Sequence, residues 1–261
     1  KPCDLVTLEV RPDRRDVKAA IARGVPVILA TGKTVHSRHK PIAQLGLNTP
    51  GVYSQGLVLI NADGSVRYQR DLDNPTACRV VQFAEARGLN LAAIVEGGNR
   101  LIAPERHSLT DFMVAHHEPE ADYVGPLSAV IDHLPVTKVL VEIPPAQMAD
   151  TYAELAGQLN GTAALVQSMP HLLEILPPGA SKGDGLRRLL DDLGVDPAHV
   201  LACGDRDNDF EMLEMVGIGV AMANGSDRLK GIADYVTASN DEDGVGLAVE
   251  KFVLNGQPAI R

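Results

Sequence analysis

Short, continuous apolar segments alternate with helical segments at both ends of this chain. Near its start, the amphipathic pattern DRRDVKAAIARG precedes the apolar run VPVILATG, and a polar helical pattern continues to about Leu45. Near its end, the alternation recurs in SKGDGLRRLLDDLG, HVLACG, DFEMLEMVG and IGVAMA. Strands that are apolar throughout are typical of parallel sheets covered by helices on both faces. The sequence therefore predicts a doubly wound, Rossmann-like α/β core.

The middle of the chain has a different pattern. It contains mixed strand segments such as TKVLVEIP, separated by helical segments such as TACRVVQFAEARG. This is typical of an α+β module inserted into an α/β core. We expect residues 1–66 and 177–261 to form the core domain and residues 67–176 to form the inserted domain. Just before the insertion, GVYSQGLVLI predicts one short strand, and NADGS predicts the turn behind it.

Composition excludes several classes of partner. A net charge of −10 argues against binding to nucleic acid or to an anionic membrane surface, and 3% aromatic residues leave few platforms for base stacking. The chain has no run of 18 apolar residues, and we recognise no signal peptide. Three widely separated cysteines fit neither a disulfide framework nor a zinc site, so we expect a cytoplasmic protein. No pattern indicates the oligomeric state.

An acidic loop follows the apolar run HVLACG. Asp205, Asp207 and Asp209 lie within five positions, where like charges repel one another. One of them could cap the following helix, but a single cap does not account for three carboxylates. A hard divalent cation with oxygen ligands does, so the loop predicts a metal site.

Two further groups follow strands or open helices in ways that suit an anion. Thr31 and Gly32 come directly after the run VPVIL, where a hydroxyl and backbone N–H groups can hold a phosphate oxygen. Lys182 lies at the start of a predicted helix, where the helix dipole does not favour a cation, so an anion nearby is suggested. Taken singly, each has an ordinary alternative, a plain turn for Thr31–Gly32 and a surface side chain for Lys182.

Together these segments resemble the haloacid dehalogenase superfamily, specifically Cof-type phosphatases with a type IIB cap domain. LEVRPDRRDVKAAIARGVPVILATGKT resembles the second motif of that family, LEILPPGASKGDGL its lysine motif, and GDRDNDFEMLEMVGIGVAMANG its fourth motif. VYSQGLVLINADGS is similar to the segment that leads into the cap, with Gln55 where Asn is usual, and Lys33 replaces the usual Arg.

The resemblance implies Mg²⁺-dependent phosphoryl transfer through an aspartyl-phosphate intermediate. Carried onto this sequence, Asp205 would bind the metal, and Asp209 would take part in the metal site and support its ligands. Thr31 and Gly32 would hold phosphate oxygens, with Asn208 facing the phosphate or a metal-bound water. Lys182 would neutralise charge near the nucleophile and the phosphate. The catalytic set is then Lys182, Thr31 and Asp209.

One part of the family pattern is missing. The nucleophile belongs to a DxDGT motif, and the chain, which begins KPCDLVTLEVRPD, contains none. We expect KPCDLV to begin the first strand and TLEV to approach the first helix, so that on the order of ten residues are absent between them. Either the sequence closes over a mobile loop, or the loop is deleted. We favour the first explanation, because a central strand cut to four residues would expose its neighbours.

The function expected from the sequence is hydrolysis of small phosphorylated metabolites, with sugar phosphates as the first substrate class. Two alternatives stay open. A protein of the same fold could bind a phosphorylated ligand without catalysis, or a phosphosugar mutase could return the phosphoryl group to the sugar.

Overall fold

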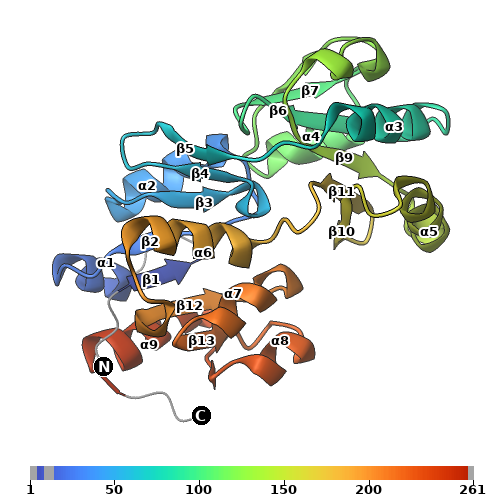
Figure 1. Ribbon diagram of the computed structural model, residues 1–261. Coiled ribbons are helices and arrows are strands. Elements are labelled where there is room, and N and C mark those ends of the chain that lie inside the picture. Colours follow the sequence, from blue (N-terminus) through green and yellow to red (C-terminus); the bar gives the residue numbers. More distant parts are fainter. Residues whose placement is uncertain (1–4, 9–14, 258–261) are drawn as a thin grey trace. The chain divides into compact units, whose positions relative to one another are not determined.

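In the computed structural model, which describes residues 5–8 and 15–257, a parallel sheet forms the centre of the first of two compact units. This unit comprises residues 1–32, 38–67 and 181–261. The strand order is β14-β13-β12-β1-β2, and every neighbouring pair is parallel. The strands are β1 (Leu5–Leu8), β2 (Val27–Leu29), β12 (Val200–Gly204), β13 (Ile218–Ala221) and β14 (Tyr235–Val236). The predicted α/β core with a parallel sheet is confirmed (Figure 1).

Helices connect these strands, as expected of parallel neighbours. Val17 and Ala20 of α1 and Val245 of α9 are buried against Val27 and Leu201 of the sheet, so α1 and α9 cover the same face. Serine side chains cap α6 and α8 at their first turns. The helices are α1 (Arg15–Ala22), α2 (His39–Leu45), α6 (Lys182–Leu193), α7 (Phe210–Met215), α8 (Asp227–Ile232) and α9 (Gly244–Val249).

The first strand differs from the sequence-based expectation. Thr7 and Leu8 belong to β1 and do not approach the first helix, because they pair with Ile28 and Leu29 of β2. All three residues of β2 have partners on β1. The expectation that a four-residue strand would expose its neighbours is therefore wrong for β2, since β2 is itself short. The predicted gap lies between Val6 and Thr7, which here are consecutive residues of β1 paired with Val27 and Ile28. Residues 9–14, which follow β1, lie outside the described residues.

The segment GVYSQGLVLI forms two strands, where the sequence predicted one. β3 (Gly51–Tyr53) and β4 (Val58–Ile60) are antiparallel and are joined by a short 3₁₀ turn, Ser54–Gly56. β5 (Val66–Gln69) completes this small sheet after the predicted NADGS turn. The chain can reverse at residues 54–56 because they adopt left-handed backbone conformations, which an apolar pattern does not reveal.

The second unit comprises residues 33–37 and 68–180. Its six-stranded sheet has the order β10-β11-β9-β6-β7-β8 and is antiparallel except for the pair β7–β8. The strands are β6 (Asn90–Val95), β7 (Arg100–Ala103), β8 (Ala121–Tyr123), β9 (Val136–Glu142), β10 (Ala164–Met169) and β11 (Leu172–Leu176), and the helices are α3 (Asn74–Glu85), α4 (Ser108–Ala115) and α5 (Met148–Leu159).

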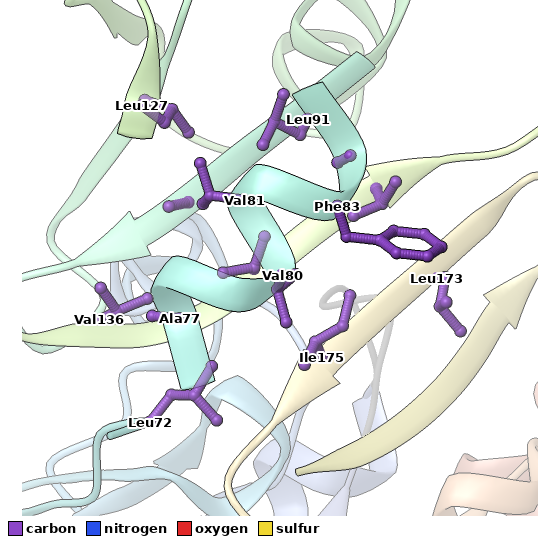
Figure 2. Packing of buried hydrophobic residues seen from close by; sticks show 14 of the residues in the cluster. Leu72, Ala77, Val80, Val81, Phe83, Leu91, Leu127, Val136, Leu173 and Ile175 are labelled. Carbon is purple, nitrogen blue, oxygen red and sulfur yellow. The ribbon is translucent and has the colours of Figure 1, made fainter. Parts of the chain in front are cut away.

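Helices cover both faces of this sheet. Val80 and Val81 of α3 pack with Ile175 and other residues of one face, in the cluster shown in Figure 2. Leu109 of α4 packs with Leu140 on the opposite face. This alternation of neighbouring residues between two apolar layers explains why β9 is almost continuously buried. Across the described residues, no helix is both long and apolar enough to cross a membrane.

Candidate active site

The acidic loop follows β12 at the carboxyl edge of the parallel sheet, where ligands of α/β proteins bind. Asp205 comes directly after the strand, and a 3₁₀ turn, Asp207–Asp209, leads into α7. Asp209 is fully buried, and its Oδ2 accepts hydrogen bonds from the backbone N–H groups of Asp205 (3.0 Å) and Arg206 (3.1 Å). Asp209 therefore fixes the backbone of the loop that carries Asp205.

Lys182 is buried beside this loop. It is the first residue of α6 and is 0% exposed, so the alternative of an ordinary surface lysine is excluded. Its Nζ donates to Oδ1 of Asp209 at 2.7 Å. A buried ammonium beside a buried carboxylate is far more stable than either charge alone. The structure thus brings together two members of the predicted catalytic set.

The close approach of Asp209 requires a glycine at the end of β12. A Cβ atom on Gly204 would lie 2.4 Å from Cβ of Asp209, which is much closer than two carbon atoms tolerate. Gly204, which ends the run HVLACG, is therefore required for Asp209 to occupy its position in the site.

Asp205 is held by two asparagines that sequence reasoning missed. Its Oδ2 accepts from Nδ2 of Asn224 at 3.3 Å and from Nδ2 of Asn240 at 2.8 Å. These residues follow β13 and β14, so three successive strand ends of the sheet contribute to one cluster. In the sequence both asparagines follow apolar runs. Ordinary turn residues occupy the same kind of position, so this signal alone does not single them out. Asp207 is exposed and accepts from the hydroxyl of Ser226.

Thr31 and Gly32 lie after β2, next to the β3–β4 hairpin. The backbone N–H of Thr31 donates to the carbonyl of Val52 at 2.9 Å, and the N–H of Gln55 donates to the carbonyl of Thr31 at 3.3 Å. The Thr31–Gly32 turn is therefore held by backbone contacts to the hairpin.

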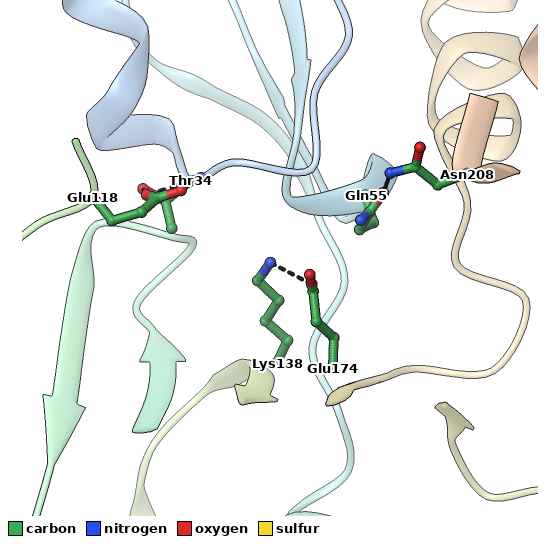
Figure 3. A network of polar contacts seen from close by, with 6 residues as sticks. All are labelled: Thr34, Gln55, Glu118, Lys138, Glu174 and Asn208. Carbon is green, nitrogen blue, oxygen red and sulfur yellow. Dashed lines mark hydrogen bonds and ion pairs between the residues drawn. The ribbon is translucent and has the colours of Figure 1, made fainter. Parts of the chain in front are cut away.

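Gln55 also contacts the acidic loop, and sequence reasoning gave it no role beyond a departure from the family pattern. Nδ2 of Asn208 donates to Oε1 of Gln55 at 3.1 Å (Figure 3). Oδ1 of Asn208 is buried and has no hydrogen-bond partner within the described part of the chain. An unpartnered buried oxygen is costly unless a ligand, an ion or a water completes it.

These groups fit a weakly held magnesium ion. No group of three His, Cys, Asp or Glu side chains among residues 5–8 and 15–257 is placed to hold a metal. Two oxygen donors of the acidic loop are the carboxylate of Asp205 and the orphaned Oδ1 of Asn208. Mg²⁺ is commonly bound by one or two carboxylates, keeping several waters and taking the rest of its ligands from a substrate phosphate. The two carboxylate oxygens of Asp209 are engaged by Lys182 and the backbone, which suits a supporting role.

Tyr53, which lies beside the site, has a strongly shifted pKa. Burial raises the pKa of Tyr53 to about 12, and the nearby positive charge of Arg38 opposes this only in part. Tyr53 ends β3 and precedes the turn that carries Gln55, so the hairpin has a buried, neutral phenol at its base.

The second unit has its own polar contacts, of which Lys138–Glu174 and Thr34–Glu118 are drawn in Figure 3. Nζ of Lys138 on β9 donates to Oε2 of Glu174 on β11 at 2.7 Å, and both side chains are buried. Thr34, which follows the Thr31–Gly32 turn in sequence, donates its hydroxyl to Glu118. Lys33, noted for its place in the family pattern, donates to the carbonyl of His116 at 3.0 Å.

Comparison with known proteins decides the family. The family model for haloacid dehalogenase-like hydrolases matches residues 12–249. The chain belongs to this family. The resemblance found in the sequence is confirmed, and the chain is a haloacid dehalogenase-like hydrolase.

Curated relatives differ in their names and in how much of their length the chain covers. The chain is 30% identical over 249 residues to "Endoribonuclease YBEY, chloroplastic" from Arabidopsis thaliana, spanning 91% of this chain but only 42% of that protein. It is 30% identical over 236 residues to the 5-amino-6-(5-phospho-D-ribitylamino)uracil phosphatase YitU from Bacillus subtilis, covering 87% of this chain and 84% of the relative.

Solved structures show the same fold. A haloacid dehalogenase-like hydrolase from Bacteroides thetaiotaomicron matches with a TM-score of 0.84 and 24% identity, covering 95% of this chain and 98% of that one. A HAD subclass IIB sugar phosphatase matches with a TM-score of 0.80 and 19% identity, covering 95% and 97%. The α/β core with an inserted domain is therefore the fold of the family.

Proposed function

We propose that this hydrolase is a Mg²⁺-dependent phosphatase of small phosphorylated metabolites, with sugar phosphates as the first class to test. The observation that carries the proposal is the fully buried Lys182–Asp209 ion pair beside the half-buried Asp205 at the sheet's carboxyl edge. Relatives named as phosphatases support it, among them YitU, whose name gives a phosphorylated ribitylamino compound as substrate. We also propose a cytoplasmic setting, in keeping with three widely separated cysteines whose spacing fits no disulfide framework.

Each predicted residue has a chemical role in this proposal. Asp205 would hold Mg²⁺, and Asn208 would offer its Oδ1 to the ion or to a water on it. Bound Mg²⁺ offsets repulsion between the phosphate and the acidic loop. Lys182 would neutralise phosphate charge while remaining paired with Asp209. The turn of Thr31 and Gly32 would donate hydrogen bonds to phosphate oxygens.

The predicted inserted domain, residues 67–176, would contact the part of the substrate that is not phosphate. It would also exclude water from the reacting group during turnover.

The absence of a DxDGT motif from the sequence supports the alternative that the protein binds a phosphorylated ligand without catalysis. Without an aspartyl nucleophile, the same residues would bind a phosphorylated ligand but not cleave it. Peptide mapping of the purified protein by mass spectrometry across residues 1–15 separates the two possibilities. Extra residues anywhere between Val6 and Arg15 would favour the phosphatase. The sequence LVTLEVRPDR found intact in this region would favour the binding protein.

Activity itself is tested by a screen of phosphorylated metabolites with and without Mg²⁺. The proposal expects release of inorganic phosphate that requires Mg²⁺ and is lost in Asp205→Asn. Asp207→Asn is the matched control, because Asp207 lies in the same loop but is exposed and bonded to Ser226. Transfer of the phosphoryl group within the sugar, without free phosphate, would indicate the mutase. No turnover of any compound by the wild-type protein would contradict the phosphatase.

A further inference from the structure

The turn that carries Gln55 is strained. Ser54 and Gln55 have φ angles of 50° and 59°, in the left-handed region that residues other than glycine rarely adopt. Both are nevertheless buried, with exposures of 0% and 4%. Such a conformation is retained only where surrounding contacts hold it, and it is found most often at functional sites.

Gln55 contacts both halves of the candidate active site. Its backbone N–H donates to Thr31, and its side-chain Oε1 accepts from Asn208. Its Nε2 lies against Gly32, only 2.6 Å from the place where a Cβ of that residue would stand. One side chain thus connects the turn after β2 with the loop after β12.

The direction of the Gln55–Asn208 hydrogen bond determines what Asn208 can bind. An amide has a donating nitrogen and an accepting oxygen. Because Nδ2 of Asn208 is engaged by Gln55, the other end of the amide, Oδ1, is left buried without a donor in the described residues. An oxygen suits a cation or the hydrogens of a coordinated water, whereas a phosphate oxygen would need the nitrogen.

We propose that Gln55 is a positioning residue that orients the Asn208 amide toward the metal and not toward the phosphate. This rests on the proposed function, since it assumes a divalent cation beside Asp205. The sequence left two roles open for Asn208, facing the phosphate or facing a metal-bound water, and the orientation set by Gln55 favours the second. It also explains why a strained glutamine is tolerated at a position where any side chain is disfavoured.

The backbone at Gln55 offers a clean test. Gln55→Gly suits the left-handed conformation and should fold at least as well as wild type, while removing the anchor of Asn208. We expect about tenfold weaker Mn²⁺ binding, measured by electron paramagnetic resonance, since a net hydrogen bond is worth roughly that factor. Gln55→Glu keeps the accepting oxygen and should stay within about threefold of wild type on the same scale. Gln167→Leu, an exposed glutamine of the second unit, is the control and should change nothing.

A double-mutant cycle completes the test. Asn208→Ala should weaken Mn²⁺ binding about as much as Gln55→Gly, and the double variant should be no weaker than either, because Gln55 acts through Asn208. Wild-type affinity in folded Gln55→Gly, or losses that add in the double variant, would overturn the role of Gln55. If the wild-type protein binds no Mn²⁺, the proposed metal site fails and the role of Gln55 fails with it.

Discussion

Nζ of Lys182 lies 2.7 Å from Oδ1 of Asp209, and neither side chain is exposed to solvent. The contact joins the first residue of α6 to the loop after β12, two segments separated by 27 positions in the sequence. Removing two charges from water is expensive, and their attraction offsets that cost only when both are present and further hydrogen-bonded. Asp209 meets this condition through the N–H groups of Asp205 and Arg206.

The first prediction concerns this ion pair. Lys182→Met should lower the free energy of unfolding by about 3–5 kcal/mol, because it leaves the Asp209 carboxylate buried without a partner. Adding Asp209→Asn should recover part of the loss, since an asparagine oxygen can still accept from the backbone but carries no charge. Urea unfolding measures both variants. A loss below about 1 kcal/mol for Lys182→Met would place the pair among ordinary surface contacts.

A second prediction compares two glycines. Gly204→Ala should destabilise the protein by about 1–3 kcal/mol, because its methyl group would collide with Asp209. Gly231→Ala is the matched control: it lies in α8 with no atom within 4 Å of the added methyl, and alanine favours a helix by up to about 1 kcal/mol. Equal effects of the two substitutions on the thermal midpoint would contradict the close approach of Asp209 to Gly204.

The third prediction concerns alkaline pH. Burial raises the pKa of Tyr53 from 10.0 to about 12, so the folded state holds this proton more tightly than the unfolded state does. Its contribution to stability is fully present below pH 10 and is lost as the pH rises toward 12. Between pH 10 and pH 12, the free energy of unfolding of Tyr53→Phe should therefore fall by up to about 2–3 kcal/mol less than that of wild type. Parallel urea titrations at several pH values measure the difference, and identical pH dependence in both proteins would contradict it.

Much of the core could be predicted from the sequence, because its signals are local. Apolar runs between helical patterns identified β2, β12 and β13 of the parallel sheet. The loop after β12 located Asp205 and Asp209, and a predicted helix start located Lys182. The hairpin at residues 51–60 was missed because its reversal depends on left-handed conformations at Ser54 and Gln55, which are not glycines.

Contacts between segments that are distant in the chain could not be predicted from the sequence. Asn224 and Asn240 hold Asp205 from two other strand ends, and each resembles a common turn residue when considered alone. The assignment of Thr7 and Leu8 to the approach to the first helix was wrong for a related reason. How many residues a central strand needs depends on how short its neighbour is, and that is known only once the strands are paired.

The central claim is that Asp205 and Asn208 form a divalent cation site, and calorimetric titration of Mg²⁺ tests it most directly. We expect binding by wild type and by Asp207→Asn, strengthened by a phosphate mimic such as vanadate, and at least about tenfold weaker binding by Asp205→Asn because that change removes the carboxylate ligand. If wild type and Asp205→Asn bind Mg²⁺ equally, or if neither binds it with or without vanadate, the account is contradicted.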